Sequence, residues 1–234
     1  MISALVLAGG LGTRLRSAVP DLPKPMAPIN GRPFLEHLID YWIKQGVSRF
    51  VLSVGYRHEV ITAHFGGKYK EATIEYVVEQ TPLGTGGGLL LGVQKLCQRE
   101  RFLLLNGDTY FTVNLKKLIE FSSANRADWG FSVFRTHEAG RYMGLDISPQ
   151  GRIVSLNSGI GQTGRLANGG VYWVNPLALI SEKFSLGDKL SLEDDIFPAS
   201  LALGQHLLGL EFSGAFIDIG VPVDYRRASL LLKV

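Results

Sequence analysis

The stretch LVLAGGLGTRLRSAVPDLPKPMAP, residues 5–28, is the most informative part of this chain. It begins inside an apolar run, Ile2 to Ala8, whose length suits a strand buried in a sheet. Glycines follow at positions 9, 10 and 12, where the backbone can approach a ligand closely and its N–H groups can converge on an anion. The stretch therefore favours a strand that ends in an anion-binding turn.

Basic residues follow these glycines. Arg14 and Arg16 come first, and Lys24 lies between Pro23 and Pro25, which restrict the backbone around it. The glycine spacing is not that of a dinucleotide fingerprint, and no Gly-Lys-Ser/Thr closes a Walker A loop. Together, the buried strand, the turn, two arginines and a restrained lysine predict a polyphosphate site.

The composition describes a globular protein with one large domain or two small ones: 234 residues, 46% hydrophobic and 19% charged. The net charge of +3 is small, and scattered basic residues argue against a nucleic-acid partner while suiting an anionic small molecule. The single cysteine, Cys97, excludes an intrachain disulfide, and its apolar neighbours predict a packed core thiol.

The N-terminus lacks the charged start of a signal peptide, and no apolar run reaches the roughly 18 residues of a membrane span. We therefore expect a cytoplasmic protein without a membrane partner.

Strands and helices alternate through the first half of the chain. The continuous apolar run at 102–106 predicts a central strand, and Asn114 is the expected cap of a helix. This order predicts an α/β fold with a mostly parallel sheet and helices on both faces. The expected strands are 2–8, 49–54, 73–78 and 102–106, and the expected helices are 33–45, 57–65, 85–97 and 115–124.

The second half reads as a smaller, partly antiparallel part. Ser191 is the expected cap of a helix to about residue 203, and Glu193, Asp194 and Asp195 read as its acidic first turn. The expected strands are 129–136, 143–148, 152–156, 169–174, 206–212 and 215–220, before a helix from about 222. We expect one domain, 1–234, whose halves meet near residue 125.

Two aspartates follow apolar runs. Asp108 comes directly after the strand at 102–106, and ligands of open α/β sheets bind at that edge. Asn106-Gly107 also suits a hairpin turn, but the preceding run is too apolar for an exposed hairpin. Asp218, inside FIDIG, is either buried and paired or functional. Two aspartates from distant strands can share one Mg²⁺.

The loop EQTPLGTGGG, residues 79–88, is a candidate base-binding segment. Its glycines at 84, 86, 87 and 88 would let backbone groups meet a flat base edge, and Glu79 could accept from the ring N–H and exocyclic amine of guanine. A plain loop with a Gly-rich packing contact is the alternative.

The segments LAGGLGTRL, PKPMAPI, LGTGGG, LLNGD and FIDIGVPVDY together resemble the sugar-1-phosphate nucleotidyltransferases, from residue 2 to about 228. RSAVPDLPKPMAPINGRPFLE and LSVGYRHE are similar to the heptose 1-phosphate guanylyltransferases of that family. The resemblance implies a Rossmann-like, GT-A-like fold with a nucleotide-binding half, about 1–125, and a sugar-binding half, about 126–234. It implies Mg²⁺ as cofactor and leaves a homodimer open.

The resemblance also implies roles for individual residues. Arg14, Lys24 and Asp108 become the expected catalytic residues, and Asp108 and Asp218 the expected metal ligands. The expected nucleotide-binding residues are Leu7, Gly9, Gly10, Gly12, Thr13, Arg14, Glu79, Pro82, Gly84 and Thr85. The expected sugar-binding residues are Asn106, Gly107, Gly144, Asn168 and Gly170.

The implied reaction is transfer of GMP from GTP to D-glycero-D-manno-heptose 1-phosphate, with release of pyrophosphate. Two alternatives stay open: a uridylyl- or cytidylyltransferase acting on another sugar 1-phosphate, and a non-catalytic regulatory subunit that binds a nucleotide sugar.

The chain departs from the family's pattern at one place. Relatives usually carry a Phe-x-Glu-Lys stretch, whose glutamate holds sugar hydroxyls and whose lysine holds the sugar phosphate. The corresponding residues here are Leu156-Asn157-Ser158-Gly159, so both charges are missing. Arg165 or another basic residue is the candidate replacement for the lysine.

Overall fold

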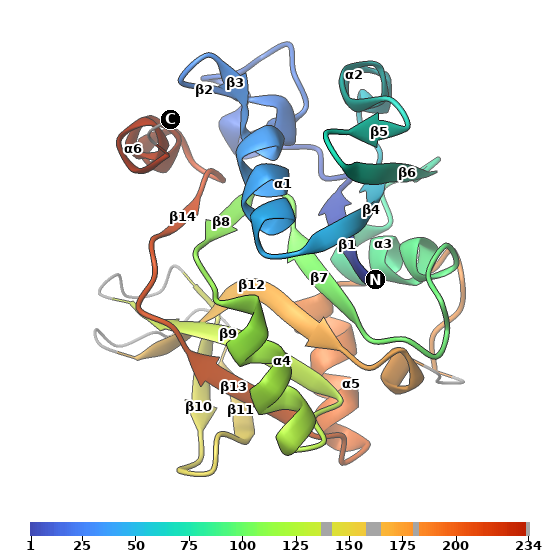
Figure 1. The fold of residues 1–234 in the computed structure, drawn as a ribbon, viewed down its shortest axis with the longest axis vertical. Coiled ribbons are helices and arrows are strands. Elements are labelled where there is room, and N and C mark those ends of the chain that lie inside the picture. The colour runs from blue at the N-terminus through green and yellow to red at the C-terminus, as the bar shows by residue number, and fades with distance from the viewer. Residues whose placement is uncertain (137–141, 158–164, 180–182, 233–234) are drawn as a thin grey trace.

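A ten-stranded sheet forms the centre of the computed structural model, which describes residues 1–136, 142–157, 165–179 and 183–232 (Figure 1). Four parallel strands occupy its middle in the order β7-β1-β4-β6, and β5 pairs antiparallel with β6. The predicted mostly parallel core is confirmed. These strands are β1 (Ile2–Ala8), β4 (Val47–Val54), β5 (Lys68–Tyr69), β6 (Ala72–Val78) and β7 (Phe102–Asn106).

An antiparallel part continues the same sheet beyond β7. The long strand β12 pairs with β7 through residues 171–174, with β10 through residues 166–167 and with β9 along its other edge. Strands from both predicted halves therefore share one sheet, and the boundary near residue 125 stays a prediction. These strands are β9 (Trp129–Arg135), β10 (Gly144–Ile147), β11 (Ile153–Asn157), β12 (Leu166–Val174) and β13 (Leu207–Glu211).

Helices cover both faces of the sheet, as predicted. Because successive strand side chains point to opposite faces, Leu103 and Leu105 pack in one core and Phe102 and Leu104 in another. The first core includes α1 (Phe34–Lys44), α2 (His58–Phe65) and α4 (Leu115–Ala124), and the second includes α3 (Gly84–Val93) and α5 (Phe197–Ala202). None of the helices in the described ranges is long and apolar enough to cross a membrane.

The C-terminal segment returns to the N-terminal loops. β14 (Phe216–Asp218) pairs antiparallel with β8 (Thr109–Phe111), and α6 (Pro222–Leu231) packs in a third core with apolar residues between Leu15 and Phe34. Asn30 Nδ2 fastens α6 by donating to Ser229 O at 2.9 Å. The remaining short elements are η1 (Thr13–Leu15), η2 (Lys24–Met26), β2 (Pro28–Ile29), β3 (Arg32–Pro33), η3 (Pro176–Leu179) and η4 (Leu192–Ile196).

Most predicted elements have the expected bounds, and Asn114 caps α4 by accepting from Lys117 N at 3.0 Å. The helix predicted over 85–97 ends at Val93, and Cys97 is exposed, so the prediction of a core thiol is wrong. Isolated turns follow that helix, and only Leu96 is buried among them. Ser191 caps as expected, but it begins a π-helical turn that precedes α5.

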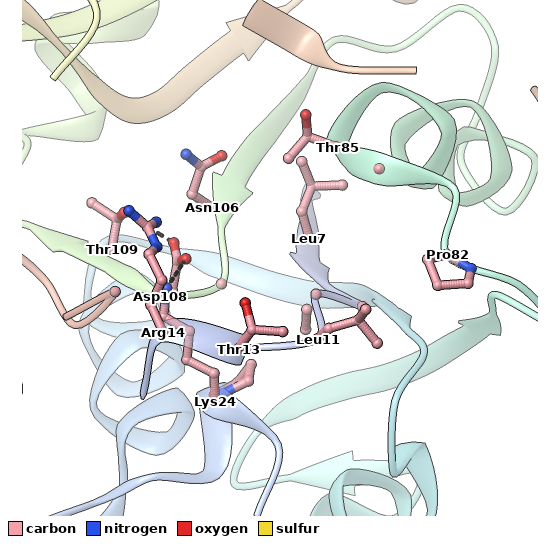
Figure 2. Close-up of a pocket in the computed structure, with 18 of the residues that line it drawn as sticks. Leu7, Leu11, Thr13, Arg14, Lys24, Pro82, Thr85, Asn106, Asp108 and Thr109 are labelled. Atoms are coloured by element: carbon pink, nitrogen blue, oxygen red, sulfur yellow. Dashed lines mark hydrogen bonds and ion pairs between the residues drawn. The ribbon is translucent and has the colours of Figure 1, made fainter. Parts of the chain in front are cut away.

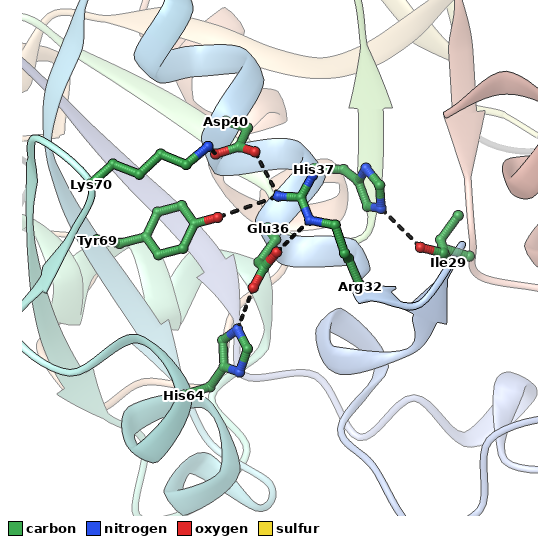
Figure 3. Close-up of polar contacts among 8 residues, drawn as sticks. All are labelled: Ile29, Arg32, Glu36, His37, Asp40, His64, Tyr69 and Lys70. Carbon is green, nitrogen blue, oxygen red and sulfur yellow. Dashed lines mark hydrogen bonds and ion pairs between the residues drawn. The ribbon is translucent and has the colours of Figure 1, made fainter. Parts of the chain in front are cut away.

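A network of charged side chains connects α1 with β3, α2 and the residue after β5 (Figure 3). Arg32 donates to Glu36 Oε2 and to Asp40 Oδ2, each at 2.6 Å. His64 of α2 contacts Glu36 Oε1 at 2.7 Å, and Lys70, directly after β5, donates to Asp40 Oδ1 at 2.5 Å. Burial raises the pKa of both carboxylates, but these hydrogen bonds outweigh it, so the pKa of each lies below its ordinary value.

We expect Arg32→Gln to lower the free energy of unfolding by about 1 to 2 kcal/mol at pH 7, because two charged hydrogen bonds at a partly exposed site are lost. The lowered pKa values of Glu36 and Asp40 stabilise the fold above their unfolded-state pKa values, and that contribution disappears as pH falls through the folded-state values. Urea unfolding from pH 7 to pH 3 therefore shows the difference between wild type and variant shrinking.

The exposed Arg99→Gln variant is the control, with no expected change at either pH. A stability difference for Arg32→Gln that stays constant with pH would contradict this account of the network.

Candidate active site

Three charged side chains from distant parts of the chain meet at one edge of the sheet, and Figure 2 labels two of them, Lys24 and Asp108. Lys24 Nζ lies 2.5 Å from Asp108 Oδ2 and 3.8 Å from Asp218 Oδ1. Lys24 begins η2, Asp108 follows β7, and Asp218 ends β14. The structure thus brings together the lysine and the two aspartates that the sequence singles out, and their roles stay predictions.

Backbone contacts fix the two aspartates. Gly107 N donates to Leu7 O at 2.9 Å, and a Cβ on Gly107 would lie 2.5 Å from that oxygen, so the turn needs glycine to cross the end of β1. Ile219 N donates to Asp108 O at 3.0 Å, which ties the segment of Asp218 directly to that of Asp108. The carboxylates are therefore held by the ends of paired strands.

The lysine keeps its partner ionised. Burial by itself would raise the pKa of Asp108, but the Lys24 ammonium and its hydrogen bond lower it below the ordinary value. Thr109 Oγ1 also donates to Asp108 Oδ1 at 3.2 Å. The Lys24 side chain is only 11% exposed, so its charge is shielded from water and acts strongly on neighbouring groups.

The two carboxylates fit a divalent cation that is shared with phosphates. Hard oxygen donors suit Mg²⁺, which commonly takes one or two protein carboxylates and completes its shell with water and substrate oxygens. Asp108 and Asp218 both face the same ammonium, so a cation could contact both. Within the described ranges, no three His, Cys, Asp or Glu side chains cluster into a closed metal site.

A cavity of about 570 Å³ opens beside these charges. Its walls come from the loop after β1, the loop before α3, the end of β7 and the end of β14. Every residue expected to be catalytic, metal-binding or nucleotide-binding lines it, and so do two of the five expected sugar-binding residues. These are Leu7, Gly9, Gly10, Gly12, Thr13, Arg14, Lys24, Glu79, Pro82, Gly84, Thr85, Asn106, Gly107, Asp108 and Asp218.

Glu79 lines the cavity together with Pro82 and is bonded to the residue after that proline. Ser53 Oγ donates to its Oε1 at 3.2 Å, and Leu83 N donates to its Oε2 at 3.0 Å. A Cβ on Gly9 would lie 2.0 Å from Oε1, so the carboxylate packs against a backbone that must be glycine. Burial raises the pKa of Glu79. Each oxygen keeps a lone pair for one more donor.

The glycines after Thr85 do not line the cavity. Gly86 N donates to Leu190 O at 2.8 Å, and a Cβ on Gly87 would lie 2.4 Å from Asp188 O. Gly88 packs against Glu79 and Ser53. The alternative of a Gly-rich packing contact therefore describes residues 86–88, and only Gly84 of the four glycines faces the cavity.

Three expected sugar-binding residues lie away from the cavity lining. Asn168 Nδ2 donates to Tyr172 OH at 2.6 Å, and its Oδ1 accepts from Gly170 N at 3.1 Å. A Cβ on Gly170 would lie 3.0 Å from Asn106 Nδ2, which places this part of β12 next to Asn106. Gly144 is buried in β10 opposite Ala167. Their sugar-binding roles stay predictions.

The stretch that lacks the Glu-Lys pair is only partly visible, since Ser158 and Gly159 lie outside the described residues. Arg165 Nη2 lies 3.4 Å from Asp146 Oδ1, and Arg165 does not line the cavity.

Two charged residues of the cavity were missed by the sequence analysis: Lys189 and Glu193. Glu193 is on the capped turn after Ser191, as expected, but it faces the cavity instead of serving only as a helix-terminal acid. Apolar periodicity does not reveal a π-helical turn, so no signal in the sequence points Glu193 inward.

Comparison with known proteins places this site in a family. The family model described as nucleotidyl transferase matches residues 3–233. The D-glycero-alpha-D-manno-heptose 1-phosphate guanylyltransferase of Aneurinibacillus thermoaerophilus is 41% identical, over 99% of both chains. The protein of the same name from Campylobacter jejuni is 36% identical, over 96% of this chain and 97% of that one.

A solved structure agrees with the sequence relatives. The crystal structure of HddC from Yersinia pseudotuberculosis complexed with GMP-PN is 33% identical, covers all of both chains and has a TM-score of 0.85. These matches cover at least 96% of the chain, including the segments that carry Lys24, Asp108 and Asp218. The chain belongs to the nucleotidyl transferase family.

Proposed function

We propose that this protein transfers GMP from GTP to D-glycero-α-D-manno-heptose 1-phosphate and releases pyrophosphate, with Mg²⁺ as cofactor. The observation that carries the proposal is the Lys24–Asp108–Asp218 cluster in a cavity large enough for a nucleotide. Full-length similarity to guanylyltransferases that are named for this sugar phosphate supports it. The cytoplasmic location and the homodimer stay predictions.

The proposed reaction needs positioning and charge neutralisation more than proton transfer. An oxygen of the sugar 1-phosphate attacks the α-phosphorus in line, and the bond from that phosphorus to the pyrophosphate oxygen breaks with its electron pair. The attacking oxygen is already ionised at neutral pH, so no general base is required. Most of the catalysis then comes from preorganised charge.

The residues of the cavity divide this work. The Lys24 ammonium offsets charge that grows at the α-phosphate, and Arg14 offsets charge on the departing pyrophosphate. Gly9, Gly10 and Gly12 bind phosphate oxygens through their backbone N–H groups. When bound by Asp108 and Asp218, Mg²⁺ would supply further charge neutralisation for the phosphates.

Glu79 supports guanine as the base. Guanine offers a ring N–H and an exocyclic amine side by side, which match the two oxygens of a carboxylate, whereas uracil offers one ring N–H. Glu79 lines the cavity with Leu11 and Pro82, and Figure 2 shows Pro82 across the cavity from Lys24 and Asp108.

The proposal is tested by pyrophosphate release with four nucleoside triphosphates, each combined with heptose, mannose, glucose and N-acetylated amino-sugar 1-phosphates. We expect GTP with the heptose 1-phosphate to give the highest kcat/KM, by at least about 10-fold over UTP, since a base-edge hydrogen bond to a charged group is lost. If turnover is highest with UTP or CTP, the assignment of guanine as the base is wrong. Binding of a nucleotide sugar without turnover of any triphosphate would support a regulatory subunit.

Lys24→Met removes the ammonium while keeping an apolar stem of similar length. We expect kcat to fall by at least about 10²-fold, the usual loss when a preorganised charge donor is removed. Steady-state kinetics give the value, and Lys116→Met, a change at an exposed surface lysine, is the matched control. Unchanged kcat in Lys24→Met would remove this lysine from the reaction centre.

Asp108→Asn removes one proposed metal ligand without changing side-chain size. We expect loss of Mg²⁺-dependent turnover by at least about 10²-fold while the protein stays folded, because the amide does not neutralise a cation. Excess chelator should reduce wild-type activity to the same level. The exposed Asp21→Asn variant is the control, and a full Mg²⁺ response in Asp108→Asn would contradict the assignment.

A further inference from the structure

Glu193 faces the reaction cavity without a role in the steps described so far. It lies on the segment 188–193, which runs along the start of α3. Gly86 N and Gly87 N donate to Leu190 O at 2.8 and 3.3 Å, and Leu190 N donates to Leu83 O at 2.8 Å. The backbone that carries Glu193 is therefore fixed to the loop that we assign to the nucleotide.

The Glu193 carboxylate is also held by side chains. Thr85 Oγ1 donates to its Oε2 at 3.2 Å, and Ser191 Oγ donates to the same oxygen at 3.3 Å. Leu192 N donates to Thr85 Oγ1 at 2.8 Å, so the threonine hydroxyl is itself oriented. No cation pairs with Glu193 in the described ranges, and burial raises its pKa.

Glu193 lies at a different part of the cavity from the reacting charges. Figure 2 shows three separate parts of the cavity wall. Thr85, which holds Glu193, lies in one part with Asn106. Lys24, Arg14 and Asp108 lie in a second part, and Pro82 lies in a third. The buried Tyr172 lies within electrostatic reach of both Glu193 and Asp108: burial raises its pKa well above the ordinary value, and both carboxylates add to the rise. Both carboxylates therefore lie near Tyr172.

The chemistry of the substrates indicates which of their groups binds next to Glu193. Phosphates are repelled by an unpaired carboxylate and are expected at Lys24 and Arg14, while the base is expected near Glu79. What remains is uncharged and rich in hydroxyl donors, which a carboxylate oxygen accepts well. Two sources have this chemistry: the acceptor sugar and the ribose of the nucleotide.

We infer that Glu193 accepts hydrogen bonds from hydroxyl groups of the acceptor sugar and so determines which sugar 1-phosphate reacts. This inference rests on the proposed nucleotidyl transfer but not on the identity of the base. Asn106 lines the same cavity and lies between Thr85, which holds this carboxylate, and Asp108 in the view of Figure 2.

The test is steady-state kinetics of Glu193→Gln with each substrate varied in turn. We expect KM for the sugar 1-phosphate to rise at least about 10-fold, because hydrogen bonds to a charged acceptor are lost, while KM for the triphosphate changes by less than about twofold. Asp194→Asn, which removes a neighbouring exposed carboxylate, should change neither value.

Deoxy substrates separate the two sources of hydroxyls. The wild-type kcat/KM should fall when the sugar 1-phosphate lacks the contacted hydroxyl. With this analogue, Glu193→Gln should have the same kcat/KM as wild type, because the hydrogen bond is already lost. If the variant instead abolishes the penalty for 2′-deoxy or 3′-deoxy triphosphate, Glu193 binds the ribose and the inference is wrong. The inference would also be wrong if Glu193→Gln changed KM for the sugar 1-phosphate and KM for the triphosphate equally, and if the losses caused by the variant and by the deoxy substrates simply added. That result would indicate a structural role for Glu193.

The outcome stays separate from the test of the proposed function. The variant is measured with whichever triphosphate and sugar 1-phosphate react best in wild type, so a different base does not affect the comparison. If no triphosphate is turned over, calorimetric binding of the same sugar 1-phosphates to wild type and Glu193→Gln gives the same answer. If the glutamine variant does not fold, Glu193→Asp replaces it. Aspartate keeps the negative charge, but its shorter side chain moves the carboxylate away from the cavity.

Discussion

The Lys24–Asp108 ion pair is the interaction around which this fold is organised. A lysine whose side chain is 11% exposed needs an acidic partner, and two aspartates on neighbouring strand ends need a cation between them. Both requirements are met only if η2, the turn after β7 and the end of β14 converge. The β8–β14 pairing, the Ile219–Asp108 backbone bond and the packing of α6 on the N-terminal loops all serve this convergence.

Much of the fold and part of the site could be predicted because their signals are local. Apolar runs that end in a polar residue mark buried strands and the edge where they end, so Asp108 and Asp218 could be singled out before their strands were placed. The same reasoning holds for the Gly-rich turn after β1 and for the Asn114 cap. In each case, a few consecutive residues are enough to determine the local structure.

The features that could not be predicted depend on contacts between distant segments. Gly86 and Gly87 are glycines because the backbone near Leu190 packs on them, not because a base does. Glu193 turns inward because a π-helical turn changes the side-chain period after Ser191. Cys97 is exposed because α3 ends early and leaves only Leu96 buried. No local pattern distinguishes these outcomes from the expected ones.

The late position of β14 has a consequence for synthesis on the ribosome. The parallel centre of the sheet, with Lys24 and Asp108, is encoded by residues 2–108, whereas Asp218 and α6 are made more than a hundred residues later. Contacts as distant as Asn30 with Ser229, 199 residues apart, can form only then, and such long loop closures slow folding. A nascent chain therefore carries an incomplete cluster after Asp108 is made and gains its second carboxylate only 110 residues later.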